Sequence, residues 1–262
     1  PALADVVLRT ARDMGLVTVD CGAVPTPALA LAAMGAGAAA VMVTGSHIPA
    51  DRNGLKFYLP GGEITKGDEA AILAALGQPA PAPAPPGPDT VTCTAAGADW
   101  VARYVSAFGP QALAGLKIGV WSHSAVSRDL LLATVAALGG TVVELGRSDI
   151  FIPVDTEAVA PEAREAIAGW VAEHGLDAVM STDGDGDRPL LADATGRVIV
   201  GDVLGQITAA SLGAEVAVTP VSSNTGVEAG GKFARVIRTK IGSPFVIAGM
   251  ETAGTGAKVA GY

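Results

Sequence analysis

The chain has 262 residues, half of them hydrophobic, which is enough to bury a sizeable core in one or two domains. Its 17 basic and 26 acidic residues give a net charge of -9, which disfavours nucleic acid as a partner because the phosphate backbone would repel it. Cys21 and Cys93 stand in unrelated contexts and indicate neither a disulfide framework nor a cysteine metal site. We expect a cytoplasmic globular protein, and the sequence contains no recognisable secretion signal.

Apolar helical segments alternate with short apolar strands along the chain, a pattern typical of α/β layering. In the first part we expect helix Leu3 to Met14, strand Leu16 to Asp20, helix Pro27 to Met34, strand Ala39 to Thr44 and, after a polar loop, helix Gly67 to Leu76. In the second we expect helix Ala98 to Phe108, strand Lys117 to Trp121, helix Ser127 to Leu138, strand Thr141 to Leu145, helix Pro161 to His174 and strand Ala178 to Thr182. In the third we expect helix Asp202 to Leu212, strand Val216 to Thr219, a turn-rich stretch and strand Ala234 to Ile237.

The stretch from Cys21 to Ser46 carries no charge and is long enough to be weighed as a membrane span. It divides at Gly35 and Gly37 into a helix-like half and a strand-like half. We therefore predict a buried helix, turn and strand, and no membrane partner.

A tract rich in Pro and Ala, Gln78 to Asp89, suits neither a helix nor the interior of a sheet, and we interpret it as an extended link between domains. The three α/β units predict domains at residues 1–95, 96–200 and 201–262. The first and third units look incomplete.

The strongest chemical signal is the segment Asp183-Gly-Asp185-Gly-Asp187-Arg188, at the end of a predicted strand. Alternate carboxylates separated by glycines can converge on one point, and such hard oxygen ligands suit Mg²⁺ or Ca²⁺. A solvated acidic turn is the simpler alternative. An EF-hand is excluded, because its loop needs Gly at position 6 and Glu at position 12, where this chain has Arg188 and Ala194.

A second signal follows the strand that ends at Thr44, where Ser46 and His47 stand side by side and Lys56 lies ten residues beyond the serine. Such a loop can present a hydroxyl nucleophile together with a stabilising charge for phosphoryl transfer. By itself the Ser-His pair before Pro49 is also compatible with an ordinary turn.

Together these loops resemble those of the α-D-phosphohexomutase family, specifically its phosphomannomutase branch. The family's phosphoserine loop reads T-A-S-H-N-P, followed by N-G-x-K, and its metal loop reads D-G-D-G-D-R. This chain has T-G-S-H-I-P from Thr44, N-G-L-K from Asn53 and an unaltered D-G-D-G-D-R, in the same order. Residues 20–27 match the family segment D-x-G-x-x-x-T-P, and residues 239–242 resemble its T-x-V-G loop, so the resemblance covers essentially the whole chain.

The resemblance implies consecutive three-layer α/β domains and a phosphorylated Ser46. It implies Mg²⁺ held by Asp183, Asp185, Asp187 and a phosphoserine oxygen. It further implies a hexose phosphate substrate that passes through a bound hexose 1,6-bisphosphate. Arg188 would contact phosphate, His47 and Lys56 would steady charge or handle the hydroxyl proton, and Thr239 and Gly242 would face the sugar.

The chain departs from the family pattern at several places. Gly45 replaces the usual Ala, and Ile48 replaces the usual Asn. The family's initial G-T-S-G-x-R-G segment, its E-A-N-G-G sugar loop and its fourth, phosphate-binding domain have no match, so we expect a chain truncated at both ends. Glu251 does not sit in the sugar-loop pattern and is assigned to a surface turn.

The leading functional hypothesis is an isomerase that exchanges mannose 1-phosphate and mannose 6-phosphate, with glucose phosphates as further substrates. Within the family the alternative is a phosphoglucosamine mutase. A catalytically incomplete sugar-phosphate-binding fragment also stays open, whereas a haloacid-type phosphatase is disfavoured because its D-x-D-x-T motif is not matched. We assign the remaining residues of note to structural roles: His123, His174, Trp100, Trp121 and Trp170.

Overall fold

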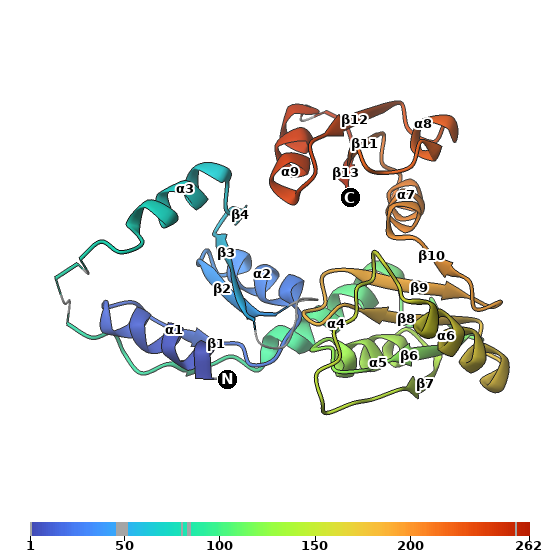
Figure 1. The fold of residues 1–262 in the computed structure, drawn as a ribbon, viewed down its shortest axis with the longest axis horizontal. Coiled ribbons are helices and arrows are strands. Elements are labelled where there is room, and N and C mark those ends of the chain that lie inside the picture. The colour runs from blue at the N-terminus through green and yellow to red at the C-terminus, as the bar shows by residue number, and fades with distance from the viewer. Residues whose placement is uncertain (1, 46–51, 80, 83–84, 255) are drawn as a thin grey trace. The chain divides into compact units, whose positions relative to one another are not determined.

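The computed structural model describes residues 2–45, 52–79, 81–82, 85–254 and 256–262. Helices and strands alternate along it, which confirms the predicted α/β class (Figure 1). The chain separates into two compact units, Pro1–Arg197 and Val198–Tyr262. The finer division into three domains stays a prediction.

The first unit opens with small elements around an antiparallel sheet. They are α1 (Ala2–Asp13), β1 (Val19–Asp20), α2 (Thr26–Gly35), β2 (Ala40–Thr44), β3 (Gly54–Leu59), β4 (Gly62–Glu63) and α3 (Lys66–Ala75). Strand β3 lies between β2 and β4, and Thr44 pairs with Gly54 at the end of the β2–β3 hairpin. The uncharged stretch is therefore a helix followed by a strand, as predicted. The predicted burial was wrong for most of it, because within these two elements only Thr26 and Ala28 of α2 and Thr44 of β2 are buried. No helix among the described residues is long and apolar enough to cross a membrane.

Strand β5 (Val91–Thr92) pairs in parallel with β1, so that Asp20 lies opposite Thr92. The residue that follows each of these strands is a cysteine, and Cys21 and Cys93 pack against the same small apolar cluster. Our expectation of unrelated contexts was wrong, because the pairing joins positions that are far apart in sequence. Burial and the neighbouring Cys93 raise the pKa of the Cys21 thiol, and both cysteines are free.

The larger part of this unit is a mostly parallel sheet with helices around it. Its elements are α4 (Ala95–Phe108), β6 (Lys117–Trp121), α5 (Arg128–Ala137), β7 (Thr141–Leu145), α6 (Pro161–His174), β8 (Ala178–Thr182) and β9 (Pro189–Asp193). Among the strands of this unit the order is β9-β8-β6-β7, and of these only β9 is antiparallel to its neighbour. Because β8 and β7 lie on opposite sides of β6, right-handed crossovers place α5 and α6 on opposite faces of the sheet.

The core of this sheet explains why its strands were easy to predict. Ile118 and Val120 of β6 pack with Val135 of α5 on one face. On the other face a side chain at Gly119 would collide with Leu145 and Leu176. A strand buried on both faces reads as a continuous apolar run, and the predicted bounds of β6, β7 and β8 agree with the structure.

Helix α6 is delimited by residues that favour a helix start and a helix stop. Pro161 occupies its first turn, where the missing N–H costs no hydrogen bond, and Gly175 closes it with a left-handed φ of 59°. Trp170 of this helix lies beside Trp121 at the end of β6, with the two ring centroids 5.9 Å apart.

The second unit is built on a small parallel sheet. Its elements are β10 (Val198–Ile199), α7 (Gly201–Ser211), β11 (Val216–Pro220), α8 (Gly226–Ala229), β12 (Arg235–Thr239), α9 (Ser243–Thr252) and β13 (Val259–Gly261). Strand β11 lies between β12 and β13, and α9 packs against all three. The assignment of Glu251 to a turn was wrong: it is an exposed residue in the last turn of α9, a helix that the sequence analysis missed.

Candidate metal centre

The three predicted metal ligands lie in the connection between β8 and β9. One carboxylate oxygen from each of Asp183, Asp185 and Asp187 lies within 4.8 Å of the other two. The loop is closed by its own backbone, because the Asp183 amide donates to the carbonyl of Arg188 at 3.1 Å and the Arg188 amide donates to Asp183 Oδ1 at 3.2 Å. The alternate carboxylates therefore converge, as their spacing predicted.

Burial makes this cluster unlike a solvated acidic turn. Asp183 is fully buried, Asp185 is 2% exposed, and only Asp187 is open to solvent. Asp185 Oδ1 has no hydrogen-bond partner among the residues that the structure describes. A buried carboxylate oxygen needs a partner, and hard oxygen donors at this density suit a divalent cation. The three aspartates thus fit a metal ion.

Lys56 of β3 reaches the same loop from the other side. Its Nζ lies 2.6 Å from Asp185 Oδ2 and 2.6 Å from Asp187 Oδ2. Burial lowers the pKa of the Lys56 ammonium, but the hydrogen bonds to both carboxylates outweigh burial and raise it. Likewise burial raises the pKa of Asp185, yet its bonds from Lys56 and Thr26 bring it down to about 2. Both groups are therefore charged at neutral pH.

Thr26, at the start of α2, is a second residue that touches the metal loop. Its hydroxyl donates to Asp185 Oδ2 at 2.8 Å, and its amide donates to the Asp185 carbonyl at 2.8 Å. Both residues are almost completely buried. The sequence analysis included Thr26 in a matched motif but assigned no role to it.

The loop after β6 forms hydrogen bonds to the metal loop and to the end of β8, next to it. The Val126 amide donates to the Gly184 carbonyl at 2.9 Å, and the hydroxyls of Ser127 and Thr182 lie 2.6 Å apart. The Nε2 of His123 lies 2.9 Å from the Thr182 carbonyl, one residue before the first aspartate. His123 is fully buried, and burial lowers its pKa, so the ring stays neutral. Its other ring nitrogen has no partner among the described residues.

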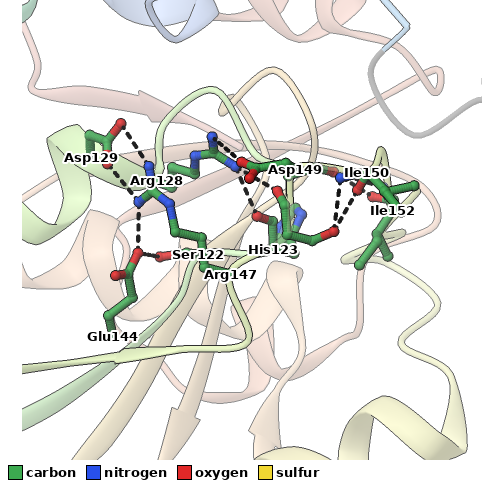
Figure 2. Close-up of polar contacts among 11 residues, drawn as sticks. Ser122, His123, Arg128, Asp129, Glu144, Arg147, Asp149, Ile150 and Ile152 are labelled. Atoms are coloured by element: carbon green, nitrogen blue, oxygen red, sulfur yellow. Dashed lines mark hydrogen bonds and ion pairs between the residues drawn. The ribbon is translucent and has the colours of Figure 1, made fainter.

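A polar network fixes this supporting loop to the loop after β7 (Figure 2). The Arg128 guanidinium donates to the carbonyls of His123 and Ser148, at 3.2 and 2.7 Å, and lies 3.6 Å from Asp149. Nearby, Arg147 pairs with both Asp129 and Glu144. The carboxyl ends of β6, β7 and β8 are thus joined at the edge that carries the acidic loop.

Among the remaining predicted site residues, Arg188 is tied to this cluster through its backbone, which exchanges hydrogen bonds with Asp183. The Nε of Arg188 lies 3.7 Å from Glu157 Oε1. Thr239 ends β12 and Gly242 precedes α9 with a φ of 125°, both in the second unit. Ser46 and His47 lie outside the described residues.

Comparison with known families and proteins gives consistent results. Residues 1–80 match the family described as "Phosphoglucomutase/phosphomannomutase, alpha/beta/alpha domain I", and residues 99–196 match domain II of the same family. The fold is also similar to a solved phosphoglucomutase/phosphomannomutase family protein of Burkholderia thailandensis, with a TM-score of 0.79 over 100% of this chain and 59% of that one. At 23% identity, this likeness concerns the fold alone.

Two curated relatives are much more similar in sequence. A phosphomannomutase of Sinorhizobium fredii is 46% identical over 259 residues, 96% of this chain and 54% of the relative. A phosphomannomutase of Salmonella muenchen is 45% identical over 250 residues, 94% of this chain and 51% of the relative. Phosphoglucosamine mutases match at 29 to 31% identity. The chain thus spans about half the length of the curated relatives that it matches, and by sequence it belongs to the phosphoglucomutase/phosphomannomutase family, in the phosphomannomutase branch.

Proposed function

We propose that this chain carries the nucleophile and the metal site of a phosphomannomutase, an isomerase that moves a phosphoryl group between C1 and C6 of a hexose. The substrates would be mannose 1-phosphate and mannose 6-phosphate, with glucose phosphates as further candidates. One observation carries the proposal: Lys56 joins the hairpin to two aspartates of the metal loop, with bonds of 2.6 Å. Ser46 belongs to the connection of that hairpin, between the paired residues Thr44 and Gly54.

In this proposal Asp183, Asp185 and Asp187 hold Mg²⁺ together with a phosphate oxygen on Ser46. The cation supplies charge neutralisation, which lets an oxygen nucleophile approach a phosphate. The carboxylates contribute position, since the backbone closure of their loop and the burial of two of them leave little freedom. Arg188 is assigned to the phosphate, and Thr239 and Gly242 to the sugar.

The reaction consists of two phosphoryl transfers. A sugar hydroxyl attacks phosphoserine, so that the bond from phosphorus to the serine oxygen breaks and one to the sugar oxygen forms. The hydroxyl proton passes by way of His47 to the serine oxygen, and the Lys56 ammonium steadies the negative charge. The product is a bound hexose 1,6-bisphosphate. After the sugar turns over, its other phosphoryl group passes to the Ser46 oxygen, and the monophosphate isomer leaves.

The choice of sugar rests on sequence distance, because the phosphomannomutases are about 15 percentage points more identical to this chain than the phosphoglucosamine mutases (46 against 31). A fragment that binds sugar phosphate without turnover is the competing hypothesis. A cytoplasmic location is part of the proposal and rests on the sequence expectation alone.

The nucleophile is tested by intact-mass spectrometry and by Ser46→Ala. We expect active protein to carry one phosphoryl group, about 80 Da, on Ser46, and the variant to lose phosphoryl transfer because an alanine side chain has no oxygen to accept the group. The assay uses a chain extended to the length of the relatives, with mannose phosphates, Mg²⁺ and a hexose bisphosphate. Wild-type turnover by Ser46→Ala would refute Ser46 as the nucleophile.

A further inference from the structure

The two oxygens of the Asp185 carboxylate have different surroundings. Oδ2 accepts a hydrogen bond from the Thr26 hydroxyl at 2.8 Å and another from Lys56 Nζ at 2.6 Å. Oδ1 is buried and has no hydrogen-bond partner among the described residues. One oxygen is therefore held, and the other is left for a ligand.

The two donors to Oδ2 differ in what a cation would do to them. The Lys56 ammonium carries a positive charge and its side chain is 31% exposed, so a divalent cation among the same carboxylates would repel it towards solvent. The Thr26 hydroxyl is neutral, so a cation does not repel it. The residue is only 2% exposed, so the packing around it keeps the hydroxyl in place. In the metal-bound state Thr26 is the donor that remains.

The position of the Thr26 hydroxyl is itself fixed at several points. The Thr26 amide binds the Asp185 carbonyl at 2.8 Å, so the two residues are joined through backbone as well as side chain. Pro25, which precedes helix α2, packs on the metal loop so closely that a Cβ at Gly186 would lie 2.8 Å from the Pro25 Cβ. The start of α2 and the metal loop thus behave as one packed element.

We propose that Thr26 is a positioning residue of the metal site: its hydroxyl holds Asp185 Oδ2 and thereby turns Oδ1 towards the cation. The inference rests on the proposed function for the identity of the cation, Mg²⁺. A hydrogen-bond donor behind a metal-binding carboxylate fixes the orientation of that ligand, and its loss typically weakens metal binding about 10- to 100-fold.

The test compares Mg²⁺ binding by titration calorimetry in the full chain and its variants. Thr26→Val keeps the β-branched shape and removes the hydroxyl, so we expect affinity to fall about tenfold or more. Thr26→Ser keeps the hydroxyl and should bind nearly as well as wild type. The matched control is Thr18→Val, because Thr18 is also buried and its hydroxyl bonds to Thr90 at 2.8 Å, away from the aspartates. Asp185→Asn alters a proposed metal ligand directly, so its Mg²⁺ affinity shows how much binding is lost when a ligand is damaged.

Each outcome has a defined meaning. Undiminished binding by Thr26→Val, or equal losses in the valine and serine variants, overturns the role of the hydroxyl, and so does an equal loss in Thr18→Val. If Thr26→Val does not fold, Thr26→Ala removes the same hydroxyl without an added methyl group and decides in its place. Wild-type protein that binds no Mg²⁺ would instead count against the proposed function, so the two failures are distinguishable.

Discussion

Lys56 offsets part of the negative charge at the metal loop. Asp185 and Asp187 would repel each other at neutral pH, and the Lys56 ammonium, 2.6 Å from each, reduces that repulsion. Breaking a buried pair by removing one partner is costly, because the other charge loses its compensation. In the absence of metal, Asp185 therefore contributes to stability through Lys56 as well as through Thr26.

This contribution should depend on pH in a definite direction. The pKa of Asp185 is about 2 in the folded chain and near 4 in an unfolded one. Above pH 4 the carboxylate is ionised in both states and its contribution is fully present; as pH falls from about 4 towards 2, the unfolded chain takes up the proton first and the contribution is lost. Asp185→Asn has no proton to gain.

We therefore expect the difference in unfolding free energy between wild type and Asp185→Asn to shrink by about 1 kcal/mol between pH 6 and pH 3. Urea unfolding of both proteins in chelator measures it. The comparison is differential because other carboxylates, such as Asp193 and Asp202, also have lowered pKa values and affect both proteins equally. A difference that stays constant with pH would contradict the assigned pairing.

At the scale of elements, the metal loop is held between the start of α2 and the loop after β6. Gly186 has a left-handed φ of 81°, and a Cβ there would lie 2.8 Å from Pro25 and 3.1 Å from Ser127. Gly175, the cap of α6, has a similar φ of 59°, but a Cβ there would meet nothing within 4 Å. Substituting Gly175 therefore tests the cost of backbone strain alone, whereas substituting Gly186 adds a steric collision to that strain.

Gly175→Ala should destabilise the chain by about 1–2 kcal/mol, the cost of a left-handed alanine, and leave Mg²⁺ affinity unchanged. Gly186→Ala should destabilise it more and also weaken Mg²⁺ binding, because the loop must move away from Pro25 and Ser127. Thermal unfolding and calorimetric titration of both variants test this pair of expectations. Equal effects of the two substitutions on metal binding would show that the packing around Gly186 does not position the site.

At the scale of the whole molecule, a mutase must present both ends of a hexose to one serine. Either phosphate then needs a site that grips it while the other is at Ser46. Residues 1–262 span 54% and 51% of the two phosphomannomutases that they resemble. The rest of those relatives has no counterpart within these residues.

We expect residues 1–262 alone to bind Mg²⁺ but to convert mannose 1-phosphate into mannose 6-phosphate far more slowly than a chain of the relatives' length. The physical reason is that the distal phosphate would lack binding partners. The nucleophile would still be present, but the sugar phosphate would not be held in the orientation that transfer requires. Parallel assays of the two chains with saturating bisphosphate and Mg²⁺ measure the ratio. Comparable turnover would mean that these residues hold the sugar phosphate unaided.

Patterns close together in the chain account for what could be predicted from sequence. The apolar runs of β6, β7 and β8 and the proline and glycine that bound α6 act locally, so their bounds were predicted correctly. The strands that follow the two chemical loops, β3 (Gly54–Leu59) and β9 (Pro189–Asp193), were not predicted. Each is held by antiparallel pairing to the strand before its loop, and their mixed exposure gives only a weak local signal.

The sequence by itself determined the α/β class, the family and the converging aspartates, because each can be recognised from short local patterns in the chain. Only the tertiary structure decided what surrounds those aspartates. The bonds from Lys56 and Thr26 to Asp185 join residues 129 and 159 positions apart. The pairing of β1 with β5 likewise brings Cys21 and Cys93 to the same apolar cluster. Such contacts arise when separate elements pack together, and no periodicity or motif along the chain encodes the distance between two side chains on different elements.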